Sequence, residues 1–463
     1  MGFGLYVALA NAVERAASMT TKMLKTIKGI RSHEDDSRDI RDILPSKTIH
    51  EDNSNVTAMG LVSRPLTEDQ ESTGGFFGDS STIAFIKQLQ DTVRLRTPGP
   101  EPMQEFSNYG SQESPTILNE TVDSHELLPP RHLADHLVDR YFSKIHTLYP
   151  FIHKEAFLAA YESLWRQNDN PSTERSANGL GLGDTRGTRT SFYYGLNIVF
   201  AMGCQFSDII QHEREAISEA FFHACKPALD VDYLEAGDLA LTQTLLLMAH
   251  YLQGSRAPNR CWHVIGIACR LAQGIGLHSD AGNDHRSFAE IQVRRRVYHG
   301  CVMLDLAISI ILGRPVIVPH KQCTPLPLPI DDRFLMVDSL VCEQPPGLFS
   351  RVEWFIATLK LYELVRKTLN TLYDNVGKDC EDELADQRQN KRLFQIQSIT
   401  QIDSELQEFQ LRIPGPLRWD VPVPEAQQYG FLREKYLLKA RYVEIHQPWF
   451  ITGNNHVRLD FCI

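Results

Sequence analysis

From residue 131 to residue 450, apolar side chains recur at intervals of three and four residues, and no run of any length alternates as a β-strand does. The clearest stripes run through "LADHLVDRYFSKIHTLYP" and "EIQVRRRVYHGCVMLDLAISIILGRP". In the second stretch, Val293, Val297, Cys301, Leu304 and Ile308 step by four, four, three and four. The pattern predicts an all-α fold in which a multi-helix domain covers residues 131–450. Its helices are expected at 133–149, 154–165, 191–206, 216–228, 236–252, 261–274, 290–312, 349–373, 392–411 and 429–445.

The flanking sequence has a different character. Residues 1–30 form a short amphipathic and mildly basic segment, which favours a helix over a cleaved signal peptide because no basic stretch precedes the apolar run. Residues 31–130 contain the charge run "RSHEDDSRDIRDILPS" and the Pro/Gly-rich "RTPGPEPM", and we expect a mostly disordered linker. Within it, the apolar residues of 76–90 predict a short ordered island. Residues 451–463 are an unpatterned tail.

Charge, hydropathy and cysteine usage exclude several classes of protein. The formal net charge of -11 disfavours a chain that lies on DNA along its whole length. No apolar run reaches the roughly 18 residues that a bilayer span requires. None of the nine cysteines belongs to a CxxC pair, so we expect no cysteine-based metal site and no cofactor in this chain.

The run of three arginines is the feature of the chain that most resembles a DNA-binding site. On a helix, Arg294 and Arg295 point away from the apolar stripe and Arg296 flanks it, so the three cations spread around the first turns. Glu290 lies one turn before Arg294 and is expected to pair with it. Asp280, Asp284 and Asp305 are the candidates to neutralise the remaining charge. Structural ion pairing is favoured, while contact with a ligand, a partner or nucleic acid stays open.

Two further patterns favour ordinary helix features over sites. His132 and His136 share a helix face at the spacing of zinc hydrolases, but Leu133 stands where those enzymes carry glutamate, which favours surface histidines. "GIGLH" from Gly274 follows no strand and is typical of a helix C-terminus. No nucleophile elbow, phosphate loop or acid–base pair is recognisable, and we therefore expect no enzyme.

Three segments together resemble the fungal-specific transcription factor domain, the middle homology region of fungal binuclear zinc cluster transcription factors. They are "LADHLVDRYFSKIHTLYPFIHKEAFLAAY", "CWHVIGIACRLAQGIGLHSD" and "EIQVRRRVYHGCVMLDLAISIILGRP", with "FFGDSSTIAFIKQ" ahead of them. The family pattern in the third segment is an acidic residue, arginines, an aromatic, an aspartate, a serine and Gly-Arg-Pro. Here it falls on Glu290, Arg294, Arg295, Arg296, Tyr298, Asp305, Ser309, Gly313, Arg314 and Pro315.

The resemblance implies a nuclear transcription regulator that controls a metabolic or secondary-metabolite gene cluster and acts through a helical regulatory domain. It leaves room for a small-molecule effector, a homodimer or other regulators as partners. The family's zinc cluster uses six N-terminal cysteines, and the first cysteine here is Cys204, so DNA contact is expected only indirectly or through a missing cluster. The alternatives are an inactive truncated regulator, or a helical ligand-binding or protein-interaction module outside transcription with a groove near Trp262, Phe200 and Tyr251.

Overall fold

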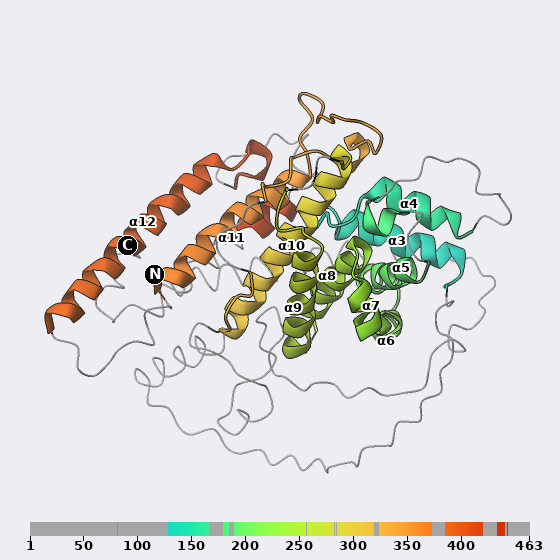
Figure 1. Cartoon of the computed structure of the whole chain (residues 1–463), viewed down its shortest axis with the longest axis horizontal. Helices are drawn as coiled ribbons and strands as arrows, with labels where there is room; N and C mark the ends of the chain where they lie inside the picture. Colours follow the sequence, from blue (N-terminus) through green and yellow to red (C-terminus); the bar gives the residue numbers. More distant parts are fainter. Residues whose placement is uncertain are drawn as a thin grey trace, which may run out of the picture. The chain divides into compact units, whose positions relative to one another are not determined.

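The computed structural model confirms a helical fold. It describes Ser81 and residues 128–165, 179–184, 189–318 (except 256, 282 and 284), 324–372, 385–419, 433–439 and 442, and no strand occurs among them. The α-helices are α3 (Arg131–Lys144), α4 (Lys154–Ser163), α5 (Arg189–Cys204), α6 (Gln211–Ala224), α7 (Val231–Ala236), α8 (Leu239–Gln253), α9 (Pro258–Gly274), α10 (Phe288–Leu312), α11 (Val352–Leu372) and α12 (Ala385–Arg412). Figure 1 shows their arrangement.

Helix α8 lies at the centre of the helical packing. It contacts α5, α9 and α10, and nearly all of its residues are buried, including Thr242, Gln243 and Thr244. Apolar side chains around the whole circumference explain this position, because such a helix can bury its surface only when it is surrounded. Two of its buried polar groups bond to backbone: Thr244 Oγ1 donates to the Ala240 carbonyl at 2.9 Å, and Gln243 Nε2 donates to the Phe151 carbonyl at 2.8 Å.

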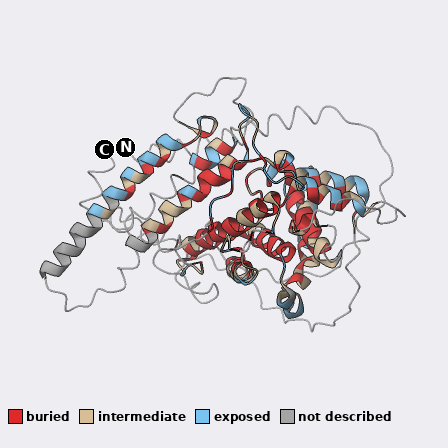
Figure 2. Cartoon of the chain, turned by 45° about the horizontal axis from the view of Figure 1, so that its top comes forward, coloured by how far each residue is buried: buried red, intermediate tan, exposed pale blue. Residues whose placement is uncertain are grey.

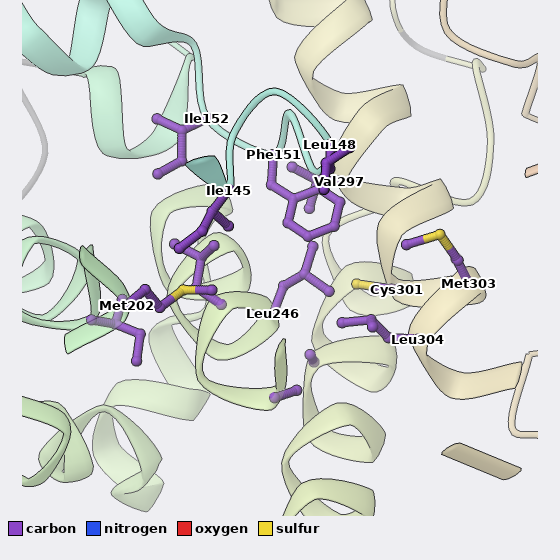
Figure 3. Packing of buried hydrophobic residues seen from close by; sticks show 14 of the residues in the cluster. Ile145, Leu148, Phe151, Ile152, Met202, Leu246, Val297, Cys301, Met303 and Leu304 are labelled. Carbon is purple, nitrogen blue, oxygen red and sulfur yellow. The ribbon is translucent and has the colours of Figure 1, made fainter. Parts of the chain in front are cut away.

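Glycines allow two close approaches that fix neighbouring helices. A Cβ added at Gly203 of α5 would lie 2.2 Å from the Leu137 carbonyl oxygen of α3, so the two backbones meet there. A Cβ at Gly300 of α10 would lie 2.4 Å from the ring of Phe151. Phe151 therefore packs directly onto α10, among the residues that include Val297 and Leu246 in Figure 3.

Helix α10 begins and ends with well-formed caps. The Ser287 hydroxyl accepts a hydrogen bond from the Glu290 amide at 3.2 Å, which satisfies one of the unpaired donors of the first turn. Gly313 ends the helix in the left-handed conformation, with φ 65°. Its amide donates to Ile310 O and the Arg314 amide donates to Ser309 O, as in a glycine-terminated helix. The expected end of this helix at residue 312 is confirmed.

The segment of residues 324–335, which ends with the short 3-10 helix Asp332–Phe334, lies against α10 and is held there by side-chain bonds to its backbone. Gln292 Oε1 accepts from the Leu328 amide at 2.8 Å, and His299 Nε2 lies 3.0 Å from the Pro325 carbonyl oxygen. Beyond it, α11 and α12 run side by side (Figure 1), and the described part of α12 keeps much of its surface exposed (Figure 2).

Several predicted boundaries shift, and some expectations lie outside the described residues. The short helix α7 was not predicted, and α6 begins at Gln211 instead of residue 216. The expectations for 1–30, for 31–130 up to residue 127 and for the 451–463 tail lie outside the described residues, apart from Ser81, which is fully buried. The limits assigned to the 131–450 domain stay a prediction.

Candidate functional site

Arg296 lies entirely inside the fold. Its side chain has no exposed surface, although Arg294 and Arg295, the two residues before it, are only half-buried. Its guanidinium forms an ion pair with Asp332 and donates a second bond to the Ile330 carbonyl at 2.7 Å. Both partners belong to the 324–335 segment. Arg296 thus holds that segment against α10 from the buried side of the helix.

Asp332 collects partners from three parts of the chain. Beside Arg296, its second carboxylate oxygen lies 3.0 Å from His146 Nε2 and accepts the Lys154 backbone amide at 2.9 Å. Burial alone would raise the pKa of Asp332, but the Arg296 guanidinium and the His146 imidazole hold it well below the ordinary value. The carboxylate is therefore charged, and His146 Nε2 donates to it. This cluster joins the end of α3, the start of α4 and α10.

The other two arginines bond to the segment that precedes α10. Arg295 forms an ion pair with Asp280, one of the three candidate carboxylates, and Arg294 donates to the Ile275 carbonyl at 3.1 Å. Glu290 forms its ion pair with Arg286, one turn earlier, so its interaction with Arg294 is limited to the attraction between their charges. Glu290 is also packed closely against Gly179, where a Cβ would lie 2.5 Å from its carboxyl carbon. Asp284 lies outside the described residues.

Asp305 does not neutralise the arginine run, so that expectation was wrong. Its carboxylate caps the chain just beyond α10, accepting from the amides of Ile317 at 2.8 Å and Val318 at 3.0 Å. Arg366 of α11 donates to the Val318 carbonyl at 2.9 Å from the other side. Burial raises the pKa of Asp305, and the two amides and the Arg366 charge only partly oppose this. We call these contacts the 317–318 clamp.

The remaining motif residues surround the turn that leads to this clamp. The Ser309 hydroxyl donates to the Pro315 carbonyl at 3.3 Å, while Pro315 itself is exposed. Arg314 donates to Asn259 Oδ1 at 2.6 Å, and its guanidinium carbon lies 5.0 Å from the ring centre of Trp262. Tyr298 is buried and packs edge-on to His299. The motif therefore has two parts. The arginines bind segments outside the long helices, and the turn after α10 contacts α9 through Arg314.

A groove of about 780 Å³ lies along the exposed side of α9, next to this turn. Its walls come from α7, α9 and Ile317 of the clamp. The sequence analysis expected Trp262, Phe200 and Tyr251 near such a groove. Of these three residues, only Trp262 lines it. Phe200 is fully buried in the core and Tyr251 stacks on Phe222. The groove lining is Leu234, Glu235, Gly237, Trp262, His263, Gly266, Ile267, Arg270, Leu271, Gly274, Ile275 and Ile317.

The other sequence candidates take ordinary positions. His132 is exposed and His136 half-buried on α3. Helix α9 ends at Gly274, as the "GIGLH" pattern predicted, although the left-handed glycine is Gly276, with φ 76°. In the part of the chain that the structure describes, no group of three or more His, Cys, Asp or Glu is arranged to hold a metal ion. Likewise, none of the described helices has both the length and the apolar character to cross a bilayer.

Comparison with known proteins gives a consistent result. Residues 138–409, more than half of the chain, match the family described as the fungal specific transcription factor domain. The lactose regulatory protein LAC9 of Kluyveromyces lactis is 24% identical over 63% of this chain and 34% of its own length. Cutinase transcription factor 1 alpha of Fusarium vanettenii is 25% identical over 64% of this chain and 29% of its own length.

A third relative, sorbicillinoid biosynthetic cluster transcription factor 2 of Penicillium rubens, is 28% identical over 46% of this chain and 30% of its own length. The chain thus spans about a third of the length of each of these relatives. No solved structure matches it. The helical fold, the ordered motif residues and the match across 138–409 place this chain in the fungal specific transcription factor domain family.

Proposed function

We propose that this chain is a transcription regulator of the fungal zinc-cluster type that works in the nucleus through its helical domain. The observation that carries the proposal is the family match across residues 138–409, which covers α4 to α11, half of α3 and most of α12. The three relatives, all named as regulatory proteins or transcription factors, are similar to it over 46% to 64% of the chain. By analogy with the sorbicillinoid cluster regulator, its targets are genes of a metabolic or secondary-metabolite cluster.

The arginine run supports a role apart from DNA contact. Arg296 is buried against Asp332, Arg295 is paired with Asp280, and Arg294 bonds to backbone. Phosphate contacts require cations that are free to displace counterions along one face. The domain therefore acts through partners, which are a second copy of the chain or another regulator that carries a DNA-binding cluster. We propose no enzymatic activity for it.

A reporter assay tests this role. The full chain is fused to a bacterial repressor DNA-binding domain, and transcription from a promoter with that repressor's operator is measured against the unfused DNA-binding domain. A reproducible rise or fall in reporter transcript supports the proposal. An unchanged transcript level, with the fusion folded and bound at the operator, contradicts it.

Gel shift with the unfused chain tests the indirect DNA contact. We expect weak binding that disappears as salt is raised from about 50 to 200 mM, as for nonspecific contacts. Tight, sequence-specific binding that survives this salt range contradicts the indirect mode.

The groove on α9 favours one second candidate, a helical ligand-binding module outside transcription. The two candidates are separated by deleting the gene in its organism and measuring transcripts. Loss of a regulator changes the transcript levels of a defined gene set, whereas loss of the alternative module leaves them unchanged.

A further inference from the structure

Two glycines lie in the apolar floor of the groove on α9, so no side chain projects into the groove at these positions. Gly266 and Gly274 lie eight residues apart on α9 and both line the groove. An added Cβ at Gly274 would meet no atom within 4 Å, and one at Gly266 would touch only Ile317, at 3.1 Å. The helix backbone is therefore accessible between the flanking side chains. The volume of about 780 Å³ lies in the range of small-molecule sites, which is roughly 300–1,000 Å³.

The walls of the groove offer flat apolar contact. Trp262 stands at one end of the α9 face, and Leu271 and Ile275 stand at the other. Leu234 from α7 and Ile317 from the clamp complete the lining. Each of these five side chains is only partly buried and packs against the core from outside. A ligand with an apolar ring body would remove this surface from water.

The charge of the groove selects the polar group of the ligand. Arg270 is exposed on the α9 face and makes no hydrogen bond or ion pair with any residue that the structure describes. His263, seven residues earlier, lies on the same face of α9 and also lines the groove. Glu235 of α7 brings a negative charge to another wall. A single anionic group therefore has a complementary place beside Arg270, and a cationic group there is repelled.

We propose that this groove binds a small aromatic or alicyclic carboxylate, with the ring on the Trp262–Leu271 surface and the carboxylate beside Arg270. Binding is a property of the groove alone. Its use as an effector site rests on the proposed function in transcription.

The groove is also connected to the family motif. Ile317 is held in its wall because Asp305 accepts the amides of Ile317 and Val318, and Arg366 of α11 binds the Val318 carbonyl. Arg314 lies over the ring of Trp262. A ligand that displaces Ile317 or Trp262 therefore acts on residues that join α10 to α11.

Three probes with the same ring test the ligand class on the full chain. They are 1-naphthoate, neutral 1-naphthalenemethanol and cationic 1-naphthylmethylamine, and binding is measured by tryptophan fluorescence and calorimetry. We expect 1-naphthoate to bind most tightly and the amine most weakly. Trp262→Phe assigns the fluorescence change, because the chain contains five tryptophans.

Two variants locate the site. Gly274→Leu adds an apolar side chain whose Cβ meets no atom within 4 Å, and it should weaken 1-naphthoate binding about tenfold, the effect of blocking roughly 50 Å² of apolar contact. Gly415→Leu, at another glycine whose Cβ meets nothing within 4 Å, is the matched control and should leave binding unchanged. Arg270→Gln should weaken 1-naphthoate binding up to about fivefold, as for an exposed ion pair, and leave the alcohol unaffected.

Equal affinity for the three probes overturns the choice of an anion. Binding that survives Gly274→Leu in a folded variant overturns the choice of groove, and so does absence of 1-naphthoate binding at millimolar concentration. None of these results bears on the reporter assay, so failure of the groove and failure of the regulatory function remain distinguishable. Conversely, probe binding with an inactive reporter removes only the effector role.

Discussion

Asp332, which binds Arg296 of α10, and Asp305, which belongs to α10, are both buried carboxylates, yet their pKa values shift in opposite directions on folding. At Asp332 an arginine and a histidine contact the carboxylate directly, and the pKa falls. At Asp305 two backbone amides bind one oxygen, the other oxygen has no hydrogen-bond partner among the described residues, and the pKa rises. The comparison shows that hydrogen bonds from neutral donors do not replace a direct counter-charge in a buried site.

The two sites also differ in what they hold. The Asp332 cluster joins α3, α4 and α10 through a segment that lies far away in sequence. The 317–318 clamp holds a few residues that follow α10 and form one wall of the groove. We therefore expect the first site to set the stability of the domain, and the second to set the position of the groove wall at little cost in stability.

The largest expected effect is that of Arg296→Glu. It places two carboxylates together in a buried site and should lower the free energy of unfolding by at least about 4 kcal/mol, which is most of the stability of a domain at the low end of the usual range of about 5–15 kcal/mol. Circular dichroism during urea denaturation measures the loss. Arg295→Glu, at the neighbouring half-buried position, is the control and should fold. A stable Arg296→Glu domain would remove the distinction between the two aspartate sites.

Asp332→Asn is expected to cost about 3 kcal/mol at pH 7, because it leaves Arg296 as an uncompensated buried charge. The pKa of Asp332 is lowered on folding, so its contribution is complete above the unfolded value of about 3.9 and is lost as pH falls through the folded value. The difference between wild type and variant should therefore shrink below pH 4. A difference that stays constant down to pH 2 contradicts the assigned shift.

Asp305→Asn should change stability at pH 7 by no more than about 1 kcal/mol, since the amide oxygen still accepts the two backbone bonds. The pKa of Asp305 is raised on folding, so wild-type stability falls as pH rises from about 3.9 to the folded value. The variant lacks this decline. If Asp305→Asn is as destabilising as Asp332→Asn, the contrast between the sites is wrong.

The smallest expected effect is that of Arg295→Gln. The Arg295–Asp280 pair is partly exposed, so its loss should cost at most about 1 kcal/mol and less at high salt. Thermal denaturation at about 50 mM and 1 M salt checks both points, since screening is stronger at the higher concentration. A larger cost that salt does not reduce would mean that Arg295 belongs with Arg296.

The sequence predicted what depends on local periodicity. The apolar stripe of α10 and its end before Gly313 follow from helix geometry, whereas Asp280 was one of three candidate partners and its pairing with Arg295 depends on the path of the chain before α10. Asp332 could not be found in this way, because it lies 36 residues beyond Arg296 in an irregular segment whose path no periodicity encodes.

Asp305 carried a signal that points to its actual role. It follows Cys301 by four residues and therefore lies on the buried stripe, where a carboxylate needs donors inside the fold. The groove depends on where α7 and the clamp approach α9, and the sequence indicated only Trp262 among its lining residues.

The central claim is that Arg296 serves the fold by neutralising Asp332, and a double-mutant cycle tests it most directly. Free energies of unfolding are measured for wild type, Arg296→Met, Asp332→Asn and the double variant. Arg296→Met leaves the Asp332 carboxylate without its counter-charge, and Asp332→Asn leaves the Arg296 guanidinium without one. We predict that the double variant is more stable, by about 2 kcal/mol or more, than the sum of the two single losses implies. Losses that add to within about 0.5 kcal/mol would show that the two residues act independently and would contradict the account.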